Sequence, residues 1–164
     1  MLILIAGLPG TGKTTIAKAY AKKYGAVHFN SDQLRRELGL WGNYRPEDKA
    51  RVYEELFAQT KAALSAGKTV VVDSTFYRAD LRKDFMELTE SQGVGIKWIL
   101  ATAPTDILHQ RVAAPRPDSE AGEMVLEKIL SEFEPLEVPH LTVDTSTTSP
   151  EAAADAIQFY ISHG

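Results

Sequence analysis

The most constraining feature of this 164-residue sequence is a glycine-rich segment near its start, GLPGTGKTT at residues 7–15. It follows an apolar run at residues 2–5, which predicts a buried strand. A segment with apolar residues at helical spacing comes directly after it. A strand, a G-x-x-x-x-G-K-[ST] loop and a helix in this order are typical of a phosphate-binding loop.

The residue types of this loop suit a polyphosphate. Glycines permit backbone conformations and close approaches that a Cβ would block, and the N–H groups of the loop and the following helix can converge on an anion. Lys13 can reach the β- and γ-phosphates, and the Thr14 hydroxyl can bind Mg²⁺. The sequence therefore predicts a nucleoside triphosphate site made by Gly7, Pro9, Gly10, Thr11, Gly12, Lys13, Thr14 and Thr15.

Composition narrows the protein class. A length of 164 residues with 44% hydrophobic residues fits one domain, residues 1–164. The apolar runs are too short to cross a bilayer, and the absence of cysteine excludes disulfides and thiolate chemistry. We therefore expect a cytoplasmic protein without membrane association, and no sequence feature indicates an obligate protein partner. The net charge of −4 argues against a broad surface for long nucleic acids.

The order of the predicted elements indicates the fold class. After the first strand and helix, short β-branched or apolar runs at residues 26–29, 69–73, 96–102 and 140–144 alternate with segments of helical spacing. This alternation predicts an α/β fold with three layers, in which a parallel sheet of about five strands carries helices on both faces. Residues 113–122 combine two prolines with charge and are interpreted as a short mobile lid.

The end of the second predicted strand carries Asp32 and Arg35. Residues three apart share one face of a helix, so this carboxylate and this guanidinium can address one pocket. Asp32 could then accept a proton from an attacking hydroxyl while Arg35 holds an anionic acceptor. Alternatively, Asp32 caps the helix and Arg35 is solvated.

Asp73 closes a strand of three valines, which is the form of an aspartate that orients Mg²⁺ or its water. Alternatively, it is a turn residue at a strand end. The next residue is Ser74, where motor-type ATPases usually have a water-activating glutamate, so transfer to a hydroxyl is favoured over hydrolysis. No N-K-x-D sequence is present, which disfavours GTPases.

Four arginines are further candidates. Arg111 and Arg116 flank the start of the predicted lid and could stabilise a transferring phosphoryl group. Arg78 and Arg82 lie four residues apart after the Asp73 strand and could hold an acceptor phosphate. For each of them the alternative is an ordinary surface arginine.

A family resemblance rests on five segments in one order: GLPGTGKTT, NSDQLR, VVVDSTFYRADLR, RVAAPRPDSEA and FEPLE. With them the chain resembles small P-loop kinases of the polynucleotide-kinase-like (AAA_33) group, which are similar also to zeta toxins, chloramphenicol phosphotransferase and gluconate kinases. The resemblance implies a three-layer P-loop kinase fold, ATP and Mg²⁺ as donor and cofactor, and transfer of the γ-phosphate to an acceptor hydroxyl. The 5′-hydroxyl of a polynucleotide is the first expectation.

The resemblance also implies residue roles. Lys13, Asp32, Arg35 and one of Arg111 and Arg116 would be catalytic, with Asp32 activating the acceptor hydroxyl. Thr14 and Asp73 would organise Mg²⁺. The acceptor site is assigned to Asp32, Arg35, Thr75 and Arg78. Pro115 and Pro117 around Arg116 depart from the family pattern, which leaves open which arginine acts.

Three alternatives remain at this stage. One is a kinase of a small metabolite, sugar or antibiotic hydroxyl, which suits the acidic composition. Another is a nucleoside monophosphate kinase, although such enzymes usually have D-G-F-P-R where this chain has D-S-T-F-Y-R. The third is a nucleotide-sensing module that transfers no phosphate.

Overall fold

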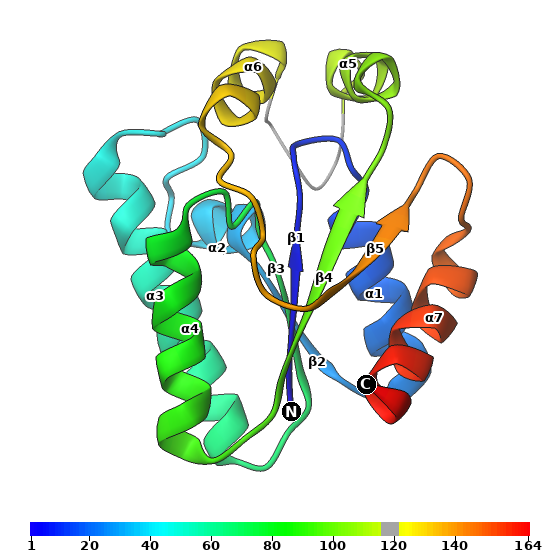
Figure 1. Ribbon diagram of the computed structural model, residues 1–164. Coiled ribbons are helices and arrows are strands. Elements are labelled where there is room, and N and C mark those ends of the chain that lie inside the picture. The colour runs from blue at the N-terminus through cyan, green and yellow to red at the C-terminus, as the bar shows by residue number, and fades with distance from the viewer. Residues whose placement is uncertain (116–121) are drawn as a thin grey trace.

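The computed structural model describes residues 1–115 and 122–164. These residues form three layers, with a five-stranded parallel sheet between two layers of helices (Figure 1). In space the strands lie in the order β2-β3-β1-β4-β5. Their bounds are β1 Leu2–Ala6, β2 Val27–Asn30, β3 Val70–Asp73, β4 Ile96–Thr102 and β5 His140–Asp144.

Helices cover both faces of this sheet. The pair α3 and α4 lies on one side, the pair α1 and α7 lies on the other, and α5 and α6 lie beyond the carboxyl ends of the strands (Figure 1). The helix bounds are α1 Lys13–Tyr24, α2 Ser31–Glu37, α3 Pro46–Ser65, α4 Ala79–Gln92, α5 Thr105–Ala113, α6 Glu123–Glu132 and α7 Pro150–His163. Among the described helices, none is long and apolar enough to cross a membrane.

Strand β1 shows why the sheet needs a helical layer on each face. All five of its residues are buried, and side chains of a strand alternate between the two faces. Leu2 and Leu4 belong to the core shared with α3 and α4, whereas Ile3 and Ile5 belong to the core shared with α1 and α7. A continuous apolar strand of this kind is stable only with both faces covered, as in parallel sheets generally.

The predicted fold class and the sheet of about five parallel strands are confirmed. Three strand boundaries differ by one residue. Strand β1 ends at Ala6 and not at residue 5, β3 begins at Val70 and not at residue 69, and β2 runs over Val27–Asn30 and not over residues 26–29. Asn30 continues the strand since it is paired with Asp73 of β3. Helix α5 ends at Ala113. The predicted lid at residues 113–122 falls largely on residues 116–121, which lie outside the described residues.

The parallel arrangement gathers the loops that carry polar residues. The carboxyl ends of β1, β2, β3 and β5 lead into Gly7, Ser31, Ser74 and Thr145, respectively. In an open parallel sheet the ligand site lies outside these ends. The fold thus brings together segments that are up to 138 positions apart in the sequence.

Candidate active site

The glycines of the phosphate-binding loop occupy backbone conformations that other residues rarely adopt. Gly7 has φ +152° and Gly10 has φ +84°. A Cβ on Gly7 would lie 2.4 Å from the carbonyl oxygen of Ala101 in β4, so no other residue fits there without displacing the strand. Gly12, with φ +81°, precedes the first turn of α1. The first N–H groups of a helix point toward its N-terminal end, where an anion can bind.

A cavity of about 640 Å³ opens over this loop. Lys13 lines it and donates a hydrogen bond of 2.8 Å from its Nζ to the carbonyl of Leu8. Six of the eight predicted loop residues line the cavity: Pro9, Gly10, Gly12, Lys13, Thr14 and Thr15. Gly7 and Thr11 are buried behind it, where Thr11 Oγ1 donates to Leu8 O at 2.8 Å and fixes the turn.

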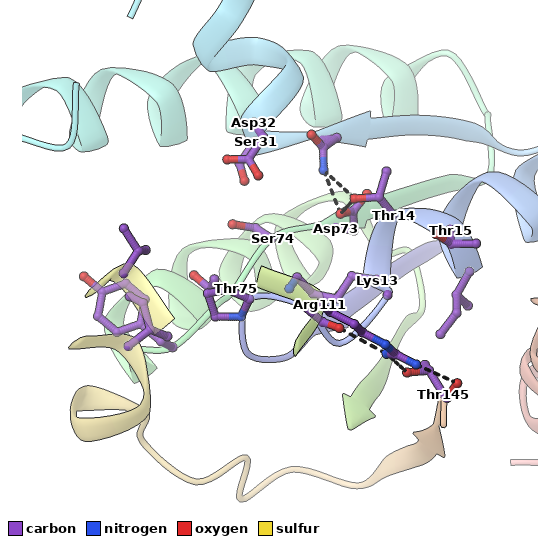
Figure 2. Close-up of a pocket in the computed structure, with 18 of the residues that line it drawn as sticks. Lys13, Thr14, Thr15, Ser31, Asp32, Asp73, Ser74, Thr75, Arg111 and Thr145 are labelled. Atoms are coloured by element: carbon purple, nitrogen blue, oxygen red, sulfur yellow. Dashed lines mark hydrogen bonds between the residues drawn. The ribbon is translucent and has the colours of Figure 1, made fainter. Parts of the chain in front are cut away.

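Thr14 and Asp73, predicted as a metal pair, are in contact. The Thr14 hydroxyl donates to Asp73 Oδ1 at 2.8 Å (Figure 2). The Asn30 amide donates to the same oxygen at 2.7 Å. The amide also lies 3.1 Å from Thr14 Oγ1. Asp73 is only 1% exposed, so its charge is stabilised by these donors and not by bulk water.

His28 is a member of this cluster that the sequence did not indicate. Its Nε2 contacts Asp73 Oδ2, on the side of the carboxylate away from Thr14 and Asn30. The sequence carries no signal for this contact, because nothing in it states that β2 lies beside β3. The contact gives Asp73 a partner on both oxygens and so fixes the orientation of its carboxylate.

The donor set fits Mg²⁺. The Thr14 hydroxyl donates to Asp73 and accepts from the Asn30 amide, so its oxygen keeps one lone pair for a further partner such as a cation. Mg²⁺ prefers oxygen ligands and is usually held by one or two protein groups, substrate phosphates and several waters. Among the described residues there is no cluster of three or more His, Cys, Asp or Glu side chains that could hold a metal ion.

Asp32 and Arg35 lie in the same cavity and are in contact. Arg35 Nη1 donates to Asp32 Oδ1 at 2.8 Å, as the i, i+3 spacing in α2 predicts. Arg35 is 6% exposed and its guanidinium lies 4.6 Å from the centre of the Tyr44 ring. The Asp32 side chain retains 24% exposure, enough to meet a ligand in the cavity.

The cap of α2 is Asn30 and not Asp32. The Asn30 side-chain oxygen accepts a hydrogen bond of 2.8 Å from the backbone N–H of Gln33. Asn30 therefore serves both sides of the site, with its amide N–H on Asp73 and its oxygen on the helix terminus. Asp32 lies in the first turn of α2 and not at the cap position, so helix capping does not account for an aspartate there.

The segment after Asp73 lines the cavity wall between the Thr14–Asp73 pair and the Asp32–Arg35 pair. Ser74 and Thr75 both face the cavity, and Ser74 Oγ lies 2.7 Å from the hydroxyl of Tyr53 in α3. Burial raises the pKa of Tyr53. The carbonyl of Thr75 accepts from the N–H of Gly7 at 3.3 Å. The predicted acceptor residue Thr75 is thus physically connected to the phosphate loop.

Arg111 lies at the other end of the cavity from Asp32, beside Thr145 (Figure 2). Its Nη1 donates to Gly10 O at 3.1 Å and to Thr145 Oγ1 at 2.8 Å, and its Nη2 donates to Thr145 O at 3.2 Å. Thr145 Oγ1 in turn donates to Thr11 O at 2.8 Å. These bonds tie the phosphate loop to the segment after β5. Arg116, the other lid candidate, lies outside the described residues.

Arg78 and Arg82 occupy different places. Arg78 is exposed, forms an ion pair with Asp80, and is not among the described residues that line the cavity. Its contact with an acceptor stays a prediction. Arg82 is 5% exposed and donates to backbone carbonyls of two segments, Phe76–Tyr77 and Glu134–Pro135. These hydrogen bonds indicate a structural role for Arg82. Burial lowers the pKa of its guanidinium.

Comparisons with known proteins found relatives of this chain by sequence and by fold. An uncharacterized protein of Mycobacterium tuberculosis is 28% identical over 125 residues, which are 69% of this chain and 25% of that protein. The L-seryl-tRNA(Sec) kinase of Methanococcus maripaludis is 26% identical over 166 residues, covering 89% of this chain and 60% of the kinase. The chain thus spans about a quarter of the mycobacterial relative and somewhat over half of the kinase.

Among solved structures, the Mycobacterium tuberculosis APS kinase CysC, determined with AMPPNP and APS, matches with a TM-score of 0.75. It is 17% identical and the match covers 98% of this chain and 96% of the other, so it shows a common fold. The family described as AAA domain (AAA_33) matches residues 2–136, which include the phosphate loop, Asp32, Asp73 and Arg111. The chain therefore belongs to the AAA_33 family.

Proposed function

We propose that this protein is a Mg²⁺-dependent phosphotransferase that moves the γ-phosphate of ATP to an acceptor hydroxyl. The proposal rests on one observation: three kinds of group line the same cavity. These are the phosphate loop with Lys13, the Thr14–Asp73 pair suited to Mg²⁺, and the Asp32–Arg35 pair. Names of the relatives support the class, since they include kinases of several acceptors.

In the proposed reaction the residues divide the work as follows. Asp32 accepts the proton of the acceptor hydroxyl, whose oxygen forms a bond to the γ-phosphorus while the bond to the bridging oxygen of ADP breaks. Lys13 and the loop N–H groups stabilise the charge on the phosphate oxygens. Mg²⁺ bound at Thr14 and Asp73 would supply further neutralisation of the β- and γ-phosphates. Arg35 fixes the Asp32 carboxylate through their 2.8 Å hydrogen bond.

For the acceptor, the resemblance to polynucleotide-kinase-like enzymes favours the 5′-hydroxyl of a nucleic acid end. Transfer to a metabolite, sugar or antibiotic hydroxyl uses the same residues in the same roles. The Ser74 that follows Asp73 favours either over simple hydrolysis, since its hydroxyl is engaged with Tyr53 and offers no carboxylate to activate water.

The test is transfer of label from γ-labelled ATP to a panel of 5′-hydroxyl oligonucleotides, nucleosides, nucleoside monophosphates, gluconate and antibiotics. We expect Asp32→Asn to lower turnover by about 10²–10⁴-fold, the usual share of general-base assistance, with ATP binding nearly intact. Asparagine keeps the shape and can still accept from Arg35, so the loss isolates the proton transfer. Lys13→Ala should abolish transfer.

The matched control is Asp84→Asn, which removes an exposed carboxylate on α4. Full activity of Asp32→Asn would assign Asp32 to the scaffold of α2 and refute its role as a base. Tight ATP binding with no label on any acceptor, from the wild-type protein, would instead favour a nucleotide-sensing module.

A further inference from the structure

A pair of hydroxyl groups in the cavity wall has no part in the reaction described above. Tyr53 of α3 and Ser74, the residue after β3, both line the cavity, and their hydroxyl oxygens lie 2.7 Å apart. Asp32 lines the same cavity (Figure 2). Because Asn30 of β2 pairs with Asp73 of β3, Asp32 and Ser74 follow neighbouring strand ends. The hydroxyl pair is therefore close to the proposed base.

Aromatic packing holds the Tyr53 ring in place. The ring centre lies 6.0 Å from that of Phe76, edge to face, and Phe76 is fully buried. Phe76 packs in the same way on Phe85 and Trp98, with 5.4 and 5.9 Å between the ring centres. A ring fixed on such a cluster keeps its hydroxyl in one position, so a ligand would meet a group that is already oriented.

The Tyr53 hydroxyl stays protonated and can donate. Burial raises its pKa, and hydrogen bonding with Ser74, with Thr75 and with the backbone at Phe76 offsets only part of the rise. Groups that lower the pKa of a phenol do so by donating to its oxygen, since they stabilise the phenolate. The Tyr53 oxygen thus accepts from its neighbours, and its own proton remains for a ligand in the cavity.

The surroundings make this donor selective. Other walls of the cavity are aromatic or aliphatic, and they include Tyr77 after β3 and Val125 and Ile129 of α6. A hydroxyl that loses contact with water in such a place costs free energy unless the ligand accepts its hydrogen bond. The cavity therefore favours a ligand that brings an oxygen to Tyr53 over one that brings a CH₂ group.

From this arrangement we propose that Tyr53 determines acceptor specificity by donating a hydrogen bond to a second oxygen of the acceptor. Since the hydroxyl pair is close to Asp32, this oxygen is carried by the carbon next to the one that bears the attacking hydroxyl. The ring oxygen of a nucleoside has this position relative to the 5′-hydroxyl, so the acceptor is a sugar or contains one. Ser74 orients the Tyr53 hydroxyl. This inference rests on the proposed function, because it describes the acceptor of that reaction.

The first experiment compares kcat/KM for two matched pairs of acceptors. Thymidine is paired with carbocyclic thymidine, in which CH₂ replaces the ring oxygen, and gluconate is paired with 5-deoxygluconate, which lacks the neighbouring hydroxyl. In the wild-type protein we expect the oxygen-bearing member of at least one pair to be preferred by about 3–10-fold, the usual gain from a hydrogen bond between neutral groups. Tyr53→Phe should abolish this preference by lowering kcat/KM for the oxygen-bearing member alone, with the KM for ATP unchanged.

Phenylalanine keeps the ring packed on Phe76, so Tyr53→Phe removes only the hydroxyl. Ser74→Ala should reduce the preference by less, since Tyr53 keeps its hydroxyl but loses the partner that orients it. Tyr24→Phe is the matched control. It removes a hydroxyl that bonds to Asp155, on a tyrosine that is not among the described residues lining the cavity, and it should change neither member. Equal losses for both members in Tyr53→Phe, or a preference that survives this substitution, would overturn the proposal.

A binding measurement separates this inference from the proposed reaction. Calorimetric titration of the same four probes into protein loaded with Mg²⁺ and a non-hydrolysable ATP analogue needs no turnover. A preference for an oxygen-bearing probe that is lost in Tyr53→Phe, in a protein without transferase activity, would support the role of Tyr53 and refute the reaction. Active transfer that does not depend on the second oxygen would leave the reaction intact and refute the role of Tyr53. Equal use and equal binding of both members in both pairs would refute it as well.

Discussion

The hydroxyl of Thr14, at the start of α1, donates a hydrogen bond of 2.8 Å to Oδ1 of Asp73, the last residue of β3. The two residues are 59 positions apart in the sequence, and the parallel pairing of β1 with β3 brings them together. This bond links the part of the cavity suited to phosphate with the part suited to a metal ion.

Asp73→Asn should weaken the use of Mg²⁺ while preserving the fold. Asparagine can still accept from Thr14 through its oxygen but lacks the charge that supports a cation. We expect the Mg²⁺ concentration for half-maximal transfer to rise about 10–100-fold, as for other residues that orient metal ligands. His28→Gln should shift it in the same direction and by less. An unchanged Mg²⁺ dependence in Asp73→Asn would remove Asp73 from the metal site.

Gly7→Ala should destabilise the protein strongly. The added Cβ would meet the Ala101 carbonyl oxygen at 2.4 Å, at a backbone φ of +152°. We expect a loss of about 2–4 kcal/mol in the free energy of unfolding, from backbone strain and overpacking together. Gly25→Ala is the matched control, because φ is +70° there and nothing lies within 4 Å. The Gly25→Ala substitution should lower the free energy of unfolding by about 1–2 kcal/mol. Urea denaturation measures both variants, and a loss in Gly25→Ala equal to or larger than that in Gly7→Ala would contradict the prediction.

Arg82→Met should lower stability by about 2–4 kcal/mol, because several carbonyls lose their donor in a buried place. Among them are Phe76 O, at 2.7 Å from Nε, and Pro135 O, at 2.7 Å from Nη1. Lys83→Met, at the neighbouring exposed position, should change stability by less than about 0.5 kcal/mol. Denaturant titration measures both. An Arg82→Met variant of normal stability with a raised KM for the acceptor would return Arg82 to the acceptor site.

Lys49 of α3 lines the cavity, and its ammonium lies 5.8 Å from the centre of the Tyr77 ring, so the pH dependence of acceptor use should report its protonation. Its pKa is lowered from an ordinary 10.5, chiefly by burial, so its ammonium loses its proton at a lower pH than in an exposed lysine. The kcat/KM for a charged acceptor should therefore fall on the alkaline side below pH 10.5, and this limb should vanish in Lys49→Met. An identical alkaline limb in both proteins would assign it to another group.

The lowered pKa of Lys49 also makes the stability of the folded protein depend on pH. Since the unfolded chain holds the Lys49 proton to a higher pH than the folded chain, protonation favours unfolding. The wild-type protein should thus gain stability relative to Lys49→Met as the pH rises from below the folded pKa toward 10.5. Denaturation midpoints at several pH values measure this difference, and a constant difference would contradict it.

Local sequence was sufficient for the order and type of the strands and for the fold class. The glycine loop needs particular residues at fixed spacing, and the valines of β3 and the alternation of elements require a buried parallel sheet. The pairing of Asp32 with Arg35 also followed from the sequence, because an i, i+3 contact is a property of a single helix.

Only the tertiary structure decided the contacts between different elements, because the sequence does not state which strands and helices are neighbours in space. His28 and Asn30 reach Asp73 because β2 happens to lie beside β3, and Lys49 faces Tyr77 because α3 packs near the end of that strand. The sequence suggested the same role for Arg78 and Arg82. In the structure Arg82 is buried and donates to backbone carbonyls, whereas Arg78 is exposed and pairs with Asp80. Periodicity fixes which face of an element is apolar, whereas the identity of the partner across a gap depends on how the elements pack.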